Sequence, residues 1–340
     1  MNKIRSYLPV LFVLVILGFF IWALLPKEDF NKKISEQIKM EKEKADVIFK
    51  NATLAEISNG IKYWELIATD SSINNSKGIA DLISVDGIFF ENGRPTIKFI
   101  APTAKWLMKG NEIYLNDPIG YDVRSEKAVR PLIEKAKKEG KGYSIFNLPL
   151  KRTSAFEGYW FEARNLNWKL ATKKLLCVGA ISLTKGNTSI RAEKLEADVG
   201  LENVILTGSP SAEIYSDDRA IIMNSNKMSV DSVSDTVIAD GNVKISRGGS
   251  VITAGKTVYD QKNNLVSLTG DVYILNGQIS AFAKRAEYDL KGDMVTLIDK
   301  AKAKRSGNEI YGDRMTIYLG RNKIVVQGKT KATVKQTEMK

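Results

Sequence analysis

The chain has 340 residues, of which 51 are basic and 39 acidic, so its formal net charge is +12. It has no histidine and one cysteine, Cys177, which excludes histidine general-base chemistry and an internal disulfide. Its carboxylate pairs fall in turn-like stretches, and no glycine motif joins a strand to a helix. The sequence therefore predicts no enzyme, no metal site and no cofactor.

The N-terminal 26 residues are predicted to be a cytoplasmic tip and a transmembrane helix. Lys3 and Arg5 precede an uncharged run over residues 7–25, which matches the ~20 residues that cross a bilayer. The run is longer than a usual signal-peptide core and has no small-x-small cleavage site after it, which favours an uncleaved anchor over a cleaved signal peptide. The positive-inside rule then predicts a single-pass membrane protein with its N-terminus in the cytoplasm and the bulk of the chain outside it.

A mixed-charge stretch over residues 27–50 is predicted to be a solvated stalk. The β region then runs from residue 51, with clusters of glycine and asparagine marking its turns. Residues 125–140, SEKAVRPLIEKAKKEG, interrupt it and are predicted to form a short helix that contains Pro131. A tail over residues 335–340 is predicted to follow the last strand.

Residues 252–274, ITAGKTVYDQKNNLVSLTGDVYI, show the pattern that the β region repeats. Apolar or small residues alternate with polar ones on both sides of a Lys-Asn-Asn turn, which predicts two antiparallel strands with one buried face each. The alternation changes phase between Ala254 and Thr257, which predicts a bulge or bend in the first strand. One such hairpin cannot bury its apolar face alone, so the copies are expected to stack.

Copies of this hairpin recur mostly at intervals of 29 residues, and a looser copy precedes the first of them. Each begins at a small residue, which we expect to leave volume between larger side chains. These starting positions are Ala101, Ala163, Ala192, Ser225, Ala254, Ala283 and Gly312. The stacked hairpins predict an all-β protein with one continuous apolar interior. Periodicity leaves open whether that interior is a packed core or a trough for an apolar ligand.

The residues predicted to line the interior, and to contact lipid if it is a trough, hold in-phase positions of the repeat. They are Phe99, Ala101, Trp106, Ile113, Leu115, Phe161, Trp168, Cys177, Leu195, Leu206, Met228, Val266, Leu268, Tyr288, Leu297 and Ile317. Their out-of-phase neighbours are expected to face outward: Lys105, Glu162, Lys169 and Glu287.

The last predicted strand, residues 323–334, has no later copy to pair with. Its unpaired backbone groups are expected to dock a strand of a partner. The in-phase residues of this edge are Ile324, Val326, Gly328 and Thr330. Nucleic acid is not predicted as a partner, because the basic part of the chain is expected outside the cytoplasm. The natural acidic partner there is a lipid head group or another envelope polymer.

Two stretches resemble known families. The strand YWELIA (residues 63–68), followed by VDGIFFENGRPTIKFIAPTAKWLMKGNEIYL, resembles the LptC family, the inner-membrane-anchored component of lipopolysaccharide export. The later phrases AGKTVYDQKNNLVSLTGDVYI and AKRAEYDLKGDMVTL resemble the LptA/OstA family of periplasmic lipopolysaccharide carriers. The chain is longer than a usual LptC and carries the helical insertion, so whether a separate LptA is needed stays open.

The resemblance implies an elongated, open V-shaped β-jellyroll, LptC-like over residues 51–185 and LptA/OstA-like over residues 186–334. It also implies a lipid-carrier role in the lipopolysaccharide transport bridge. The expected partners are an inner-membrane ABC transporter and either LptA or the outer-membrane translocon, paired through edge strands. A carrier of another envelope lipid and a structural spacer with a filled core remain as alternatives.

Overall fold

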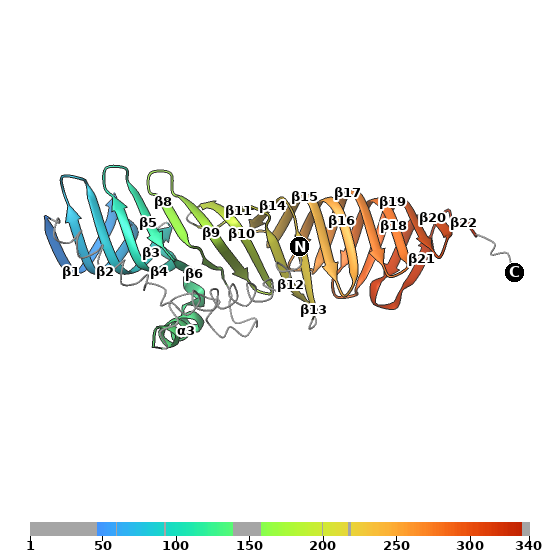
Figure 1. The fold of residues 1–340 in the computed structure, drawn as a ribbon, viewed down its shortest axis with the longest axis horizontal. Helices are drawn as coiled ribbons and strands as arrows, with labels where there is room; N and C mark the ends of the chain where they lie inside the picture. Colours follow the sequence, from blue (N-terminus) through green and yellow to red (C-terminus); the bar gives the residue numbers. More distant parts are fainter. Residues whose placement is uncertain are drawn as a thin grey trace, which may run out of the picture.

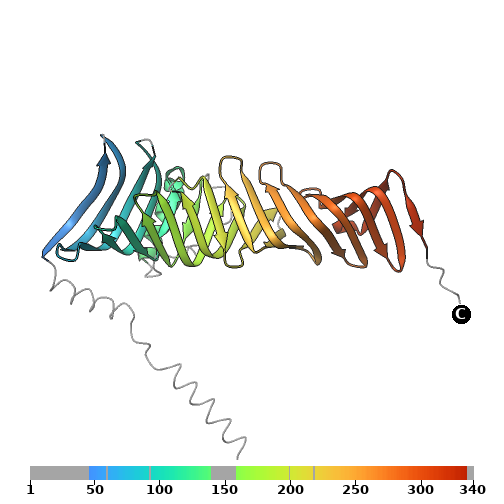
Figure 2. The ribbon, with the colours of Figure 1, turned by 90° about the horizontal axis from the view of Figure 1, so that it is seen from above.

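The computed structural model describes residues 46–58, 60–91, 93–138, 158–198, 200–216 and 219–334. All 22 of its strands belong to one antiparallel sheet that winds along a single long axis, with β1 at one end and β20 to β22 at the other (Figure 1). Turning the molecule by 90° shows the strands crossing this axis at a slant along its whole length (Figure 2). The predicted elongated all-β fold is therefore confirmed.

The strands of the first half are β1 (Val47–Ser58), β2 (Ile61–Asn74), β3 (Ile79–Glu91), β4 (Arg94–Leu107), β5 (Glu112–Asn116), β6 (Ile119–Asp122), β7 (Trp160–Glu162), β8 (Asn165–Lys169), β9 (Lys174–Lys185) and β10 (Thr188–Asp198). Those of the second half are β11 (Asn203–Thr207), β12 (Ser211–Ser216), β13 (Arg219–Asn224), β14 (Lys227–Asp231), β15 (Thr236–Arg247), β16 (Ser250–Asp260), β17 (Leu265–Asn276), β18 (Ile279–Asp289), β19 (Met294–Arg305), β20 (Asn308–Tyr318), β21 (Lys323–Gln327) and β22 (Lys331–Thr333).

The predicted helix is present as α3 (Glu126–Lys138), with Pro131 inside it and a single 3-10 turn, η1 (Val123–Ser125), before it. It projects from the side of the strand stack (Figure 1). An ion pair between Lys98 on β4 and Glu126 fixes its start to the sheet. The helix is therefore an insertion between β6 and β7 that leaves the stacking of the strands intact.

The predicted anchor and most of the predicted stalk lie outside the described residues. Within the described ranges, no helix combines the length and apolar character that crossing a membrane requires. The β region starts at Val47, inside the range predicted to be stalk, because residues 47–58 pair with β2 over their whole length. At the predicted boundary between residues 185 and 186 the sheet is continuous, since β9 and β10 form a hairpin there.

The long strands bend at a bulge. Where short strands lie beside a long one, its two halves pair with different short strands. In β15 the first half pairs with β14 and the second half with β13, and the extra residue falls at Gly241–Asn242. In β17 it falls at Gly270–Asp271, where both residues have positive φ, 81° and 51°. Two consecutive left-handed residues turn the strand sharply, which glycine tolerates at least cost.

The bend explains the repeat's change of phase. In β16 the side chains of Ile252 and Ala254 are buried, those of Gly255 and Lys256 are exposed, and burial resumes at Thr257. The predicted irregularity is therefore confirmed, although the extra residue belongs to the facing strands. Gly270, which the two-residue period places in phase with Val266 and Leu268, is exposed at this bend.

The small residues that begin each copy lie opposite these bulges. Ala283 pairs with Val272, and Gly312 pairs with Ala301, each beside the bulge of the facing strand. At Gly312 an added Cβ would lie 2.3 Å from Cγ1 of Val326. At Gly312 a small residue is therefore needed because the bend is crowded. That the small residues of the other copies leave free volume stays a prediction.

Candidate functional site

One apolar cluster fills the molecule from Trp64 to Leu319. The predicted lining residues belong to it and are each at most 3% exposed, with the exception of Trp106, which is half-buried and packs against it. The interior is thus continuous from the N-terminal strands to η3 (Leu319–Arg321), as the repeat predicted. Its side chains pack against one another, so a ligand would have to displace them. Contact of these residues with lipid stays a prediction.

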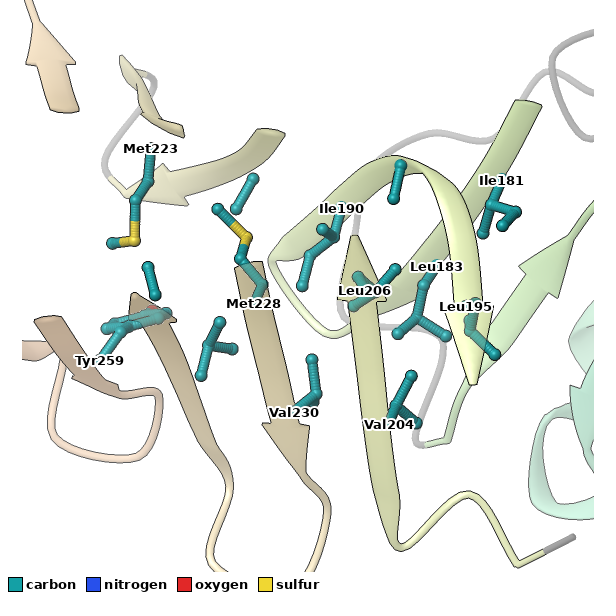
Figure 3. Close-up of a cluster of buried hydrophobic side chains, with 14 of the residues drawn as sticks. Ile181, Leu183, Ile190, Leu195, Val204, Leu206, Met223, Met228, Val230 and Tyr259 are labelled. Carbon is teal, nitrogen blue, oxygen red and sulfur yellow. The ribbon is translucent and has the colours of Figure 1, made fainter. Parts of the chain in front are cut away.

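The middle of this interior shows how several strands contribute to one lining. Leu183 from β9, Leu195 from β10 and Leu206 from β11 lie together, with Ile190 beside them (Figure 3). Farther along the axis, Met228 from β14 and Met223 from β13 continue the row toward Tyr259 (Figure 3). Methionine is unbranched and fills irregular gaps, so this section can repack around a different shape.

The N-terminal end of the interior is aromatic. The ring of Trp64 contacts that of Trp106 at 5.9 Å and that of Trp168 at 5.6 Å, both edge to face. Phe89 lies 4.1 Å from Trp168 and 4.8 Å from Phe99, measured between ring centroids. Sequence reasoning missed Trp64 and Phe89 as lining residues. Their signal was the apolar alternation of the looser first copy, in phase with Leu66 and Val85.

The ends of the bent strands form two rows of turns, which we name rim A and rim B. Rim A consists of the turns β2–β3, β4–β5, β8–β9, β10–β11, β14–β15, β16–β17, β18–β19 and β20–β21. Rim B consists of the turns β1–β2, β3–β4, β9–β10, β15–β16, β17–β18 and β19–β20. The pairings assign each turn to its rim, because Asn203 on rim A pairs with Asp231, and Val251 near rim B pairs with Leu275.

A buried arginine connects the two rims in the second half. Arg247, at the end of β15 on rim B, donates from Nη1 to the carbonyl oxygen of Leu290 on rim A at 2.7 Å. The same nitrogen lies 3.2 Å from the hydroxyl of Tyr288 and 3.2 Å from Oδ1 of Asp293. Burial raises the pKa of Tyr288 to about 12, and the hydrogen bond from Arg247 opposes that rise. The tyrosine therefore stays neutral and the ion pair is Arg247–Asp293.

Further cross-rim contacts lie on both sides of Arg247. Lys185, at the end of β9, forms an ion pair with Asp235 and lies 3.4 Å from the carbonyl oxygen of Ser232. Asn276, at the end of β17, donates from Nδ2 to the carbonyl oxygen of Leu319 at 3.1 Å. Arg305, at the end of β19, donates to the carbonyl oxygen of Asn322 at 3.3 Å. We call these contacts, together with those of Arg247, the rim ties. Together they hold the rims against each other from β9 to η3.

Between the rims of the N-terminal part there is a cleft of about 970 Å³. Tyr63 and Phe90 line it from rim B, and Lys173 and Glu202 line it from rim A. Trp168 and other members of the apolar cluster line its deeper part. Lys173 lies across it, with Nζ 4.8 Å from the centroid of the Tyr63 ring. Here the apolar interior is accessible from the side.

Two outward or edge predictions need correction. Glu162, expected to face solvent, is buried, because it pairs with Ser182 of β9 and Ile119 of β6 in the middle of the sheet. The last strand is not continuous. It is divided into β21 and β22 by a bend at Gly328, whose φ is 86°, and Gly328 and Thr330 are exposed. Of the predicted edge residues, Ile324 and Val326 are half-buried against the interior.

Comparison with known proteins supports the two resemblances. Residues 10–128 match the family model described as lipopolysaccharide-assembly, LptC-related. Residues 223–323 match the model described as LptA/(LptD N-terminal domain) LPS transport protein. The resemblance read from the sequence motifs is therefore confirmed for both parts of the chain.

Among solved structures, the chain is similar to LptH from Pseudomonas aeruginosa, described as the LptA homologous periplasmic component of the conserved lipopolysaccharide transport device. The identity is 16% and the TM-score 0.32, and the match covers 34% of this chain and 95% of that one. No curated protein matches. By sequence, the chain is thus similar to two components of lipopolysaccharide transport.

Proposed function

We propose that this chain is a periplasmic lipid carrier of lipopolysaccharide transport. It receives lipopolysaccharide from an inner-membrane ABC transporter and passes it toward the outer membrane without catalysis. The observation that carries the proposal is the single apolar interior that runs from Trp64 to Leu319. Each methylene that leaves water contributes about 0.8 kcal/mol, so a lipid with several acyl chains needs a continuous apolar path across an aqueous compartment. The two family matches support lipopolysaccharide as the cargo.

The positions of those matches support a further proposal, in which the two parts of the chain have different roles. The N-terminal part, residues 1–185, would anchor the chain in the inner membrane through residues 1–26 and take up lipid through its LptC-like strands. Residues 186–334 would extend the path as an LptA-like segment. The sheet that continues through β9 and β10 supports this arrangement, because lipid would meet no break at the junction. The unpaired side of β21 and β22 would dock LptA or the outer-membrane translocon.

The packed interior requires that the two halves of the bent strands separate when lipid enters. The bulges at the bends provide the flexible line, and the rim ties oppose separation. The same packing favours a second candidate function, a structural spacer with a permanently filled core. The two functions differ in whether lipid reaches the interior.

Site-specific photo-crosslinking in cells tests the proposal. A benzophenone amino acid at Trp168 or Tyr288, both buried, should capture lipopolysaccharide, and the same group at the exposed neighbours Lys169 or Glu287 should capture little. Capture of a different lipid would identify a carrier of that lipid. Equal or no capture at the two sets of positions would favour the spacer and contradict the carrier.

A further inference from the structure

Three of the four described strands that end at rim B next to a rim tie finish with a basic residue. Lys185 ends β9, Arg247 ends β15 and Arg305 ends β19, whereas Asn276 holds the same position in β17. Because this position recurs with the repeat, the three cations form a row along the line where rim A meets rim B. We call this line the mouth of the apolar interior. We call this row the basic row. Each member extends to the opposite rim, so the row lies where the interior meets solvent.

The partners of Arg247 leave its guanidinium incompletely satisfied. The side chain is more than nine-tenths buried, and its hydrogen bonds to rim A are made by Nη1. Within the described part of the chain, Nε is buried and has no acceptor. A guanidinium has five N–H donors in a planar fork that suits the paired oxygens of a phosphate or carboxylate. The site therefore has donor capacity that the protein's own acceptors do not use.

Opening the mouth would break the rim ties and separate these cations from their acceptors on rim A. An unpaired charge at an apolar boundary is costly, so opening needs a replacement anion. An amphiphile whose chains lie in the interior places its head group at the mouth, beside the basic row. A phosphate there would supply several acceptors to the nearest cation.

We propose that the basic row binds the phosphate groups of a lipid head group, and that this exchange of partners holds the loaded mouth open. The proposal rests on the carrier function proposed above and adds the chemical class of the head group that the chain recognises. With their contacts to rim A formed, Lys185, Arg247 and Arg305 close the mouth. In the loaded protein they are ligands of the cargo.

Titration of the purified full-length protein with two short-chain lipids below their micelle concentrations tests this. Dioctanoyl phosphatidic acid and dioctanoylglycerol share their acyl chains and differ in the phosphate. We expect the phosphate-bearing lipid to bind about tenfold tighter, the effect of one charge-assisted hydrogen bond. Arg247→Gln and Arg305→Gln should each remove about that factor for phosphatidic acid and leave dioctanoylglycerol binding undiminished. Arg305 is exposed, so its variant tests the row even if Arg247→Gln does not fold.

Lys304→Gln is the matched control, because Lys304 is adjacent in β19 and forms an ion pair with Glu309 instead of a rim tie. Its affinities should equal those of the wild type. Equal binding of the two lipids by the wild type would overturn the basic row and leave the carrier function standing, whereas binding of neither would overturn both. Inorganic phosphate should compete only weakly. Binding of free phosphate as tight as that of phosphatidic acid would overturn recognition of a lipid head group.

Discussion

At the scale of single residues, two glycines lie directly against buried aromatic rings. An added Cβ at Gly120 would lie 2.1 Å from Cε1 of Phe161, and Gly87 has the same relation to Phe99. We predict that Gly120→Ala lowers the free energy of unfolding by about 1–3 kcal/mol, because the ring cannot move away within a packed interior. Chemical denaturation measures this loss. Gly110→Ala is the control, since its nearest atoms are 3.9 Å away, and its effect should stay within about 0.5 kcal/mol.

Cys177 provides a reporter of the interior at the same scale. It is fully buried, and burial raises the pKa of its thiol to about 12. The folded chain thus holds the thiol proton more tightly than the unfolded chain, whose cysteine pKa is about 8.5. Its contribution to stability is complete below that pH and declines as the pH rises toward 12.

We predict that a water-soluble maleimide labels Cys177 at pH 8 only after denaturant unfolds the protein. We also predict that Cys177→Ala weakens the fall in denaturation midpoint between pH 8 and pH 10, since it removes one group with a raised pKa. Rapid labelling of the native protein would show that the interior opens to water without lipid. An unchanged pH profile in the variant would contradict the contribution of the thiol.

At the scale of elements, the bend of β17 depends on a close approach between two glycines on paired strands. Gly270 has a φ of 81°, and an added Cβ would lie 3.2 Å from the Cα of Gly255 on the paired strand. We predict that Gly270→Ala destabilises the protein by about 1–3 kcal/mol through backbone strain and crowding together. Gly277, in the β17–β18 turn, has a φ of 56° and its nearest atom at 3.6 Å. Gly277→Ala therefore isolates the strain, and a loss as large as that of Gly270→Ala would exclude crowding at the bend. Thermal unfolding of the two variants decides between these outcomes.

The strands could be predicted because their burial has a period of two that repeats along the chain. Ile252, Val266 and Leu268 were placed correctly on that basis alone. The location of α3 followed from composition and a break in the repeat. The prediction that Glu162 faces outward was wrong, because a bulge or the start of a new strand changes which alternate residues are buried.

The rim ties could not be predicted from the sequence. They join residues of opposite rims that lie 17 to 50 positions apart, and polar residues in turns carry no periodic signal. Arg247 belongs to an Arg-Gly-Gly-Ser turn, which reads as ordinary hairpin chemistry. Its burial depends on how far the two halves of the bent strands slant past each other. This offset between the two halves is a property of the folded molecule and has no pattern in the sequence.

At the scale of the whole molecule, the interior is accessible at one end and tied shut along the other. The cleft lies over the aromatic cluster around Trp64 and Trp168, and the rim ties begin with Lys185. Lipid that follows this axis would therefore reach an accessible section first and would have to open the ties in sequence afterwards. Lipid would move along such a path only if a section that holds lipid and a section without it differ little in stability. The section around Met223 and Met228 can repack, which keeps that difference small.

In the proposed function, the C-terminal edge is where this path would continue into another protein. Among the described residues, β21 and β22 pair only with β20, which leaves the other side of each strand without a partner. Lys323, Lys329 and Lys331 are exposed and discourage random pairing, so an edge with acidic character is the expected partner. Deletion of residues 323–340 removes this edge. It takes from the interior only the half-buried side chains of Ile324 and Val326.

We predict that the protein truncated at residue 322 keeps its β-rich circular dichroism spectrum, since β1 to β20 retain their pairings. A photo-crosslinker at Tyr288 should still capture lipid in it, because uptake precedes docking. Co-purification with the next jellyroll protein and delivery of lipid to the outer membrane should both be lost. Deletion of residues 335–340 alone, which leaves β22 in place, should preserve both. If the protein ending at residue 322 fully complements a strain that lacks the intact chain, the docking edge lies elsewhere in the molecule.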